Sequence, residues 1–170
     1  MLRAATLWLA AQGYEVMATG RNASRLDNLR AQSKSITTLP CDYGQLEEFI
    51  SSIRQSSSEQ SQPGFDLVLA WIHGDDEPIL KRIAELIEEK PDTQWKLFHV
   101  LGSSGNVDAI RKKIQMSPRC NYFQIQLGFK LEGNFSRWLS NEEISAGTIA
   151  SMREEKNVLV GQLEPWEDRP

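Results

Sequence analysis

The chain has 170 residues, of which 25% are charged and 40% hydrophobic; this is the composition of a globular protein and excludes a largely disordered one. Its formal net charge of −4, without any run rich in Lys and Arg, argues against nucleic acid or an anionic membrane as the main partner. The apolar run at residues 4–11 is too short to span a bilayer and lacks the flanks of a signal peptide, so we expect a cytoplasmic protein.

Helix-like and strand-like apolar patterns alternate along the whole chain. Residues 2–12 are apolar nearly all round, which is typical of a well-buried helix, and Gly13 follows as its expected C-terminal residue. Ser24 is the expected cap of the next helix, and residues 56–64 form an expected polar surface loop. The expected helices are 2–12, 24–33, 43–57, 78–89, 107–115 and 141–154, and the expected strands are 14–19, 36–40, 65–72, 95–101, 122–127 and 158–160, with a hairpin around Gly133-Asn134.

This alternation predicts the fold class. Strands that are joined by helices form right-handed crossovers between parallel strands. The continuous apolar run at residues 65–72 is typical of a parallel strand that is covered on both faces. We therefore expect a single α/β domain over residues 1–170, with a doubly wound parallel sheet in three α/β/α layers.

Several fragments, by their order and spacing, resemble the short-chain dehydrogenase/reductase family. Residues 2–26 (LRAATLWLAAQGYEVMATGRNASRL) resemble its first helix, second strand and second loop. Cys41-Asp42 follows the third strand, residues 66–69 belong to the fourth, and Gly102-Ser103-Ser104 follows the fifth. The resemblance covers nearly the whole chain and weakens after residue 105. It implies a Rossmann-like fold that binds a nicotinamide dinucleotide.

The resemblance places cofactor-binding residues at several strand ends. An acid after the second strand binds the ribose 2′-hydroxyl in such folds, whereas an arginine pairs with a 2′-phosphate, so Thr19-Gly20-Arg21-Asn22 favours NADP over NAD. A solvated loop arginine is the alternative. Asp42 matches the position that meets the adenine amino group, or else it caps the following helix. Leu2 lies at the helix N-terminus that holds the pyrophosphate, and Trp71 stands in the segment that lines the cofactor.

The start of the chain departs from the family pattern. The family's domain opens with a strand and a glycine-rich turn before the helix that begins here at Met1-Leu2. In the family's strand order (3-2-1-4-5-6-7) that first strand lies between those expected at 14–19 and 65–72, and its loss leaves unpaired backbone groups at about 1–3 kcal/mol each. We therefore expect an N-terminally incomplete domain in which Met1 is not the natural start. The alternatives are a shortened protein with a rearranged sheet and one that a partner stabilises.

The family's catalytic residues are matched only in part. Most members use a Tyr-x-x-x-Lys pair on the helix after the fifth strand, with a serine that orients the substrate. Ser103 or Ser104 supplies the serine here. The tyrosine that follows, Tyr122, has Gln126 four residues later, and its segment alternates like a strand. His73, at the carboxyl end of a strand, is a further acid/base candidate, with a partly exposed loop histidine as the alternative.

Several other residues have structural interpretations. His99, inside the apolar strand KLFHVL, is expected to be a packed core histidine. Cys41 and Cys120 are expected to be buried reduced thiols, with a disulfide or a reactive thiol as the alternative. Trp138 and Trp166 belong either to the subunit interface of a homodimer or to the core.

Three functional hypotheses follow from these residues. The first is an NADP-binding oxidoreductase that transfers a hydride to or from a small-molecule substrate, with Ser103 or Ser104 polarising the substrate and His73 or Tyr122 moving the proton. The second is a non-catalytic Rossmann module that senses a nucleotide or serves as a partner subunit, which the absent Tyr-x-x-x-Lys pair favours. The third is an inactive, N-terminally truncated fragment.

Overall fold

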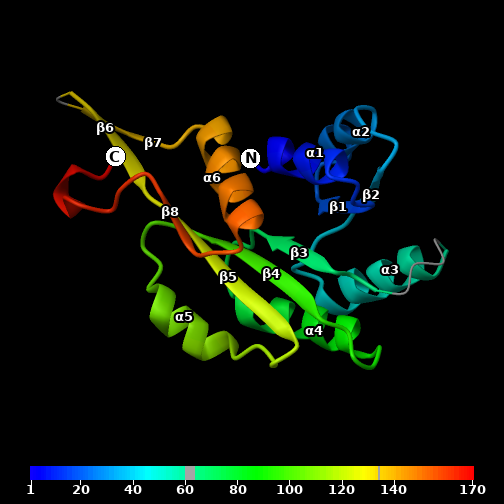
Figure 1. The fold of residues 1–170 in the computed structure, drawn as a ribbon. Coiled ribbons are helices and arrows are strands. Elements are labelled where there is room, and N and C mark those ends of the chain that lie inside the picture. The colour runs from blue at the N-terminus through cyan, green and yellow to red at the C-terminus, as the bar shows by residue number, and fades with distance from the viewer. Residues whose placement is uncertain (60–63, 134) are drawn as a thin grey trace. The chain divides into compact units, whose positions relative to one another are not determined.

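The computed structural model describes residues 1–59, 64–133 and 135–170, whose fold is drawn in Figure 1. Its helices are α1 (Arg3–Ala11), α2 (Ala23–Arg30), α3 (Leu46–Glu59), α4 (Asp76–Glu88), α5 (Val107–Ile114), α6 (Asn141–Glu154) and the short 3₁₀ helix η1 (Trp166–Asp168). Its strands are β1 (Val16–Gly20), β2 (Ile36–Pro40), β3 (Leu67–Ala70), β4 (Trp95–Leu101), β5 (Cys120–Leu127), β6 (Phe129–Glu132), β7 (Phe135–Trp138) and β8 (Val158–Val160). Parallel strands flanked by helices confirm the α/β fold of the doubly wound type. Over these three stretches of chain, none of the helices is long and apolar enough to cross a membrane.

The chain divides into two compact units, which we describe separately. Unit 1 comprises Met1–Ala4, Asp66–Gly74 and Gln94–Pro170, and unit 2 comprises Ala5–Phe65 and Asp75–Thr93. Unit 1 contains a parallel sheet of order β3-β4-β5-β8 and the antiparallel hairpin β6-β7, whereas unit 2 contains the parallel pair β1-β2.

In unit 2, local side-chain bonds set the starts of two helices. Helix α2 begins at Ala23 because the Asn22 side chain accepts the Arg25 N–H at 2.9 Å, so the expectation that Ser24 is the cap is wrong by two residues. Helix α3 begins later than expected, because Asp42 holds a turn before it. The Asp42 carboxylate accepts the Gly44 N–H at 2.9 Å, and its carbonyl accepts the Gln45 N–H at 3.0 Å.

The polar loop expected at 56–64 is only partly a loop. Helix α3 continues to Glu59, because serine disfavours a helix only modestly. The buried apolar face of the preceding turns stabilises the helix enough for it to extend through this serine-rich stretch. That face consists of Phe49, Ile50 and Ile53, all nearly inaccessible to solvent. Residues 60–63, also within the expected loop, lie outside the described residues.

In unit 1, β4 is the most buried strand of the parallel sheet. Trp95, Leu97, Phe98 and Val100 are each at most 1% exposed. Side chains of a strand alternate between its two faces, so the contacts of helices α5 and α6 show which face of the sheet each helix covers. Arg111 of α5 bonds to Gln124 on one face, and Glu155, just after α6, pairs with Lys96 on the other. Helices α5 and α6 therefore cover opposite faces, as Figure 1 shows.

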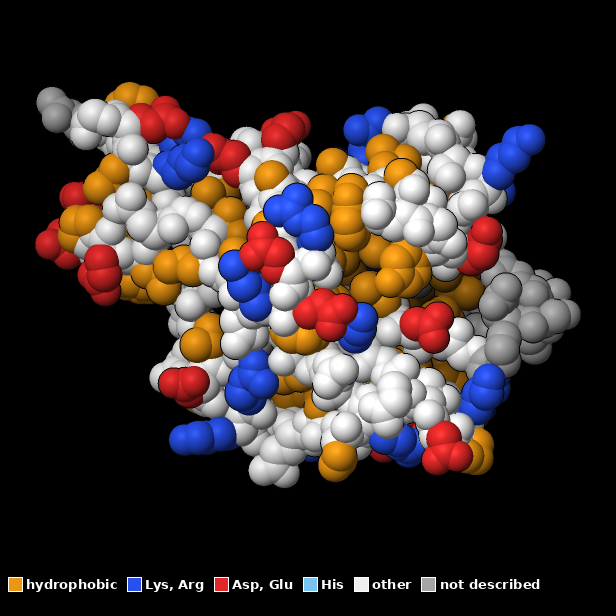
Figure 2. Space-filling view, viewed as in Figure 1, with side chains coloured by type: hydrophobic (Ala, Val, Ile, Leu, Met, Phe, Trp, Pro, Cys, Tyr) orange, Lys and Arg blue, Asp and Glu red, His pale blue; other side chains and the backbone are white. Residues whose placement is uncertain are grey.

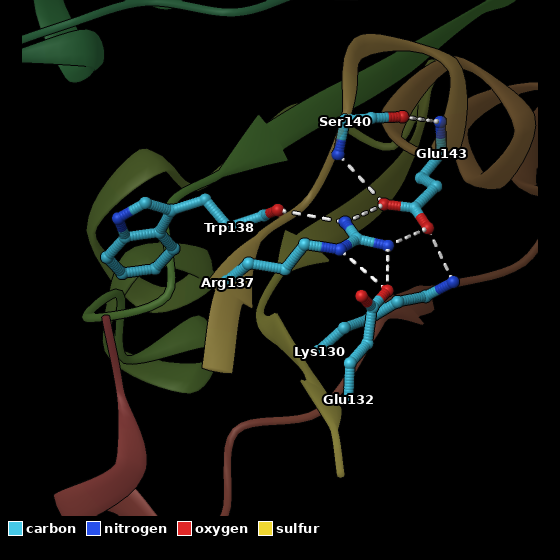
Figure 3. A network of polar contacts seen from close by, with 6 residues as sticks. All are labelled: Lys130, Glu132, Arg137, Trp138, Ser140 and Glu143. Atoms are coloured by element: carbon cyan, nitrogen blue, oxygen red, sulfur yellow. Dashed lines mark hydrogen bonds and ion pairs between the residues drawn. The ribbon is translucent and has the colours of Figure 1, made fainter. Parts of the chain in front are cut away.

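The hairpin β6-β7 is joined to the start of α6 by a network of charges (Figure 3). The Arg137 guanidinium bonds to both Glu143 carboxylate oxygens, at 2.9 and 3.0 Å, and to Glu132 at 2.7 Å. Lys130 also pairs with Glu143. The same glutamate closes a capping box, because its carboxylate accepts the Ser140 N–H at 2.8 Å while the Ser140 hydroxyl accepts the Glu143 N–H at 3.2 Å. One carboxylate thus fixes both the hairpin and the helix start.

This network predicts an acid-sensitive contribution to stability. Hydrogen bonds from Arg137, Lys130 and the Ser140 backbone hold the pKa of Glu143 well below its ordinary value of 4.5. A carboxyl group whose pKa is lowered by folding stabilises the folded state above the ordinary pKa, and this contribution declines as the pH falls below it. In urea unfolding, we expect a gap between the wild type and Glu143→Gln that is constant near neutral pH and shrinks in acid. A gap that widens in acid would contradict this assignment.

Both cysteines are thiols in the described part of the chain, with no disulfide between them. Cys120 is buried, as expected, whereas Cys41 is only partly buried, and its thiol lies 3.3 Å from the Leu39 carbonyl. Burial raises the pKa of the Cys41 thiol, and this disfavours the reactive thiolate.

Candidate functional site

In unit 1, two neighbouring strands direct candidate residues to the same edge of the sheet. Strand β3 ends at Ala70 and is followed by Trp71 and His73. Strand β4 pairs with it in parallel and is followed by Ser103 and Ser104. Because ligands of open α/β sheets bind outside the carboxyl ends of the strands, this edge is the candidate site of unit 1.

Trp71 and His73 form a bonded pair at this edge. The indole Nε1 lies 2.7 Å from the imidazole Nε2, and the rings meet edge to face with centroids 5.1 Å apart. An indole N–H is only a donor, so the His73 Nε2 atom is the acceptor and a neutral ring carries its proton on Nδ1. His73 is exposed, so this imidazole lies at the surface of the site.

The two serines lie in a tight turn between β4 and α5. The Gly105 N–H donates to the Gly102 carbonyl at 3.1 Å, with Ser103 half-buried and Ser104 exposed between them. Gln126 on β5 fixes this turn from the neighbouring strand, since its side-chain amide donates to the Gly105 carbonyl at 2.8 Å. The turn therefore presents two hydroxyl groups from a rigid backbone.

Tyr122 lies elsewhere in unit 1. It is opposite Leu97, four residues before the end of β4, which corresponds to about 13 Å along the strand. Its hydroxyl is 2.9 Å from the Nδ1 atom of His99, and the Arg111 guanidinium lies 4.8 Å above its ring. The structure therefore brings together His73, Trp71 and the serines at one edge, whereas Tyr122 belongs to a contact between β4, β5 and α5.

His99 confirms the prediction of a packed core histidine, because none of its surface is exposed. The polar residues around it were not expected from the sequence. Gln124, only 4% exposed, donates to the Val107 carbonyl at 2.8 Å and accepts from Arg111 at 3.3 Å. The signal was available in the glutamines at every second position of the strand (YFQIQL), which put both of them on the face covered by α5.

In unit 2, Arg21, Asn22 and Asp42 lie at the carboxyl ends of β1 and β2. These ends are held together by the Cys41 N–H, which donates to the Gly20 carbonyl at 3.0 Å. Arg21 is exposed. The side-chain oxygens of Asn22 and Asp42 already accept backbone N–H groups, as described above, so these two residues shape the edge and Arg21 supplies its charge.

Leu2, at the start of α1, is half-buried within unit 1. The adjacent Met1 carbonyl accepts a hydrogen bond from the Ser145 hydroxyl of α6 at 3.1 Å. The chain directly before α1 is thus tied to α6 within unit 1. The N–H groups at a helix start attract anionic groups of a ligand.

Comparisons with known proteins agree with this architecture. No protein-family model matches the sequence, and no curated protein does. Among solved structures, a short-chain dehydrogenase from Streptomyces avermitilis aligns with a TM-score of 0.62 at 12% identity over 94% of this chain and 83% of that one. A carbonyl reductase from Pseudomonas aeruginosa PAO1 aligns with a TM-score of 0.60 at 12% identity over 98% of this chain and 92% of that one. The chain therefore has the fold of short-chain dehydrogenases and reductases.

Proposed function

We propose that this protein binds NADP and acts as an oxidoreductase of the short-chain dehydrogenase kind. The observation that carries the proposal is Arg21, an exposed guanidinium placed directly after β1 in a fold shared with such enzymes. A guanidinium can bond a phosphate through two parallel N–H groups. An adenosine without the 2′-phosphate lacks the oxygens that accept these two bonds. This preference favours NADP over NAD.

The residues at the edge of unit 1 support carbonyl chemistry. A bound nicotinamide exchanges a hydride with the carbon of a substrate carbonyl or alcohol. Ser103, half-buried in its turn, is the hydroxyl that orients the substrate oxygen, with Ser104 as its more exposed neighbour. The neutral His73 ring, whose Nε2 atom accepts from Trp71, donates a hydrogen bond from Nδ1 to that oxygen, and the proton that the oxygen takes up comes from solvent at this exposed edge.

A second function is favoured by Tyr122. The Tyr122 hydroxyl is hydrogen-bonded to His99, and the residue four positions after Tyr122 is Gln126 rather than a lysine. Tyr122 therefore does not provide the tyrosine and lysine pair of the family. A chain that kept nucleotide binding without this pair would be a nucleotide sensor or a partner subunit rather than a reductase.

Titration with NADPH, with NADH as the comparison, tests the proposal. We expect NADPH to bind more tightly than NADH, and Arg21→Ala to weaken NADPH binding on the order of tenfold while leaving NADH binding unchanged. Arg30→Ala is the matched control, because Arg30 is an exposed arginine at the other end of α2. Equal affinity for the two nucleotides, or an equal loss in both arginine variants, would refute the NADP assignment.

A set of carbonyl substrates with NADPH then separates the two functions. NADPH oxidation that falls in His73→Gln and Ser103→Ala, with nucleotide affinity unchanged, supports the oxidoreductase. Binding of NADPH without turnover of any carbonyl supports the non-catalytic module.

A further inference from the structure

The hairpin of unit 1 has one protected edge and one open edge. Beside β6, the Phe129 N–H and carbonyl exchange hydrogen bonds with Gln162 of the C-terminal segment, both at 2.9 Å. The other edge is β7, which pairs only with β6 among the strands of the described chain. Open edges of this kind are templates for pairing with another strand.

The hydrogen-bond pattern shows which groups of β7 point outward. Because the Phe129 backbone faces Gln162, the pair Phe129–Trp138 does not exchange ladder bonds. Such pairs alternate with hydrogen-bonded ones in an antiparallel ladder, so Leu131–Ser136 is also a pair without ladder bonds. The Ser136 N–H and carbonyl therefore face away from β6, toward the open edge.

Large exposed apolar side chains gather around this edge. Of the large hydrophobic residues that are exposed in the described chain, four belong to the hairpin and the C-terminal segment: Leu131, Phe135, Trp138 and Trp166. Phe135 is the most exposed of them, at 61%. Figure 2 shows hydrophobic side chains interspersed with charged ones over this region. Phe135 lies on the face of the hairpin that Arg137 occupies, whereas Leu131 and Trp138 lie on the opposite face, so exposed apolar side chains flank the hairpin on both faces.

The charges of β7 do not oppose pairing of the strand with a copy of itself. The only ionisable residue of β7 is Arg137, and its charge is balanced by Glu132 and Glu143. In an antiparallel pair centred on Ser136, each Arg137 stands opposite the Phe135 ring of the other copy. Both side chains leave the same face of the strand, so the guanidinium can lie against the ring. No like charges stand directly opposite each other.

We propose that β7 is the self-association surface of this protein, in which two copies pair antiparallel about Ser136. The Ser136 groups exchange two hydrogen bonds, and the two strands become the centre of a four-stranded sheet across the dimer. A two-fold axis through a hydrogen-bonded pair requires outward-facing backbone groups at the central residue, which is the arrangement that the hairpin has. A second copy is the occupant that this self-complementary register fits.

Charge substitutions at Ser136 test the register, because this residue faces its own copy. Ser136→Lys and Ser136→Asp each place like charges opposite one another, and we expect the dissociation constant of the dimer to rise on the order of tenfold or more in each. An equimolar mixture of the two variants should restore dimers, as measured by analytical ultracentrifugation of the full chain. Circular dichroism of each variant verifies that it folds.

Leu159→Lys is the control for a lysine placed on another edge strand, because Leu159 is 48% exposed and lies on β8, the edge of the four-stranded sheet. We expect this variant to dimerise as the wild type does. A wild type that stays monomeric, Ser136 variants that dimerise normally, or dimers that only Leu159→Lys disrupts would each overturn the proposal.

Discussion

Gly128→Ala is expected to lower the free energy of unfolding by about 3 kcal/mol or more, because the added methyl group meets backbone rather than flexible side chain. A Cβ atom at Gly128 would lie 2.1 Å from the Gln162 carbonyl oxygen and 2.7 Å from its carbon. Gly161, in the C-terminal segment, has a left-handed conformation with φ +79°. A Cβ atom at Gly161 would lie 2.6 Å from the Phe129 carbonyl oxygen. The C-terminal segment can cross the base of the hairpin only through these two glycines.

Urea denaturation monitored by circular dichroism measures this effect. Gly102→Ala is the control in the same unit, since a Cβ there meets nothing within 4 Å and its φ is not in the left-handed region. We expect the control to be unchanged, or more stable by up to about 1 kcal/mol because alanine restricts the unfolded chain. If Gly128→Ala is as stable as Gly102→Ala, the crossing of the two segments is not as close as the structure has it.

The sequence predicted the elements well because their apolar periodicity is local information. Strand β4, helix α6 and strand β8 have the expected bounds, since each combines a clear pattern with a clear end. The starts of α2 and α3 were misplaced because they depend on which side chain reaches which N–H, at Asn22 and Asp42. The bond between Phe129 and Gln162 joins residues far apart in the sequence, and no periodicity signals it.

The candidate site, like the fold, could be predicted from the sequence only in part. Strand order alone places His73 and Ser103 at one sheet edge, because carboxyl ends of parallel neighbours meet there. The bond between Trp71 and His73 depends on side-chain rotamers, which the sequence does not encode locally. Tyr122 was a candidate because of its residue type, but the register of β4 and β5 directs it to His99 instead.

Tyr122→Phe gives the second large effect, and it distinguishes a structural from a catalytic tyrosine. The variant removes only the hydroxyl oxygen, which lies 2.9 Å from Nδ1 of the fully buried His99. Loss of a hydrogen bond to a buried polar group costs about 1–3 kcal/mol, so we expect the free energy of unfolding to fall by about 2 kcal/mol. The Arg111 guanidinium keeps its place above the ring, so the β5–α5 contact persists.

The matched comparison is Tyr43→Phe, which removes the same hydroxyl from a half-buried tyrosine of unit 2. Because the hydroxyl of a less buried side chain is replaced by water on its removal, we expect a smaller loss there. If the protein reduces carbonyls, Tyr122→Phe should keep the pH profile of turnover at a temperature where it is folded, since the proton comes from the sheet edge near His73. A changed pH profile with unchanged stability would instead place Tyr122 in proton transfer, which requires β5 to shift from the register described here.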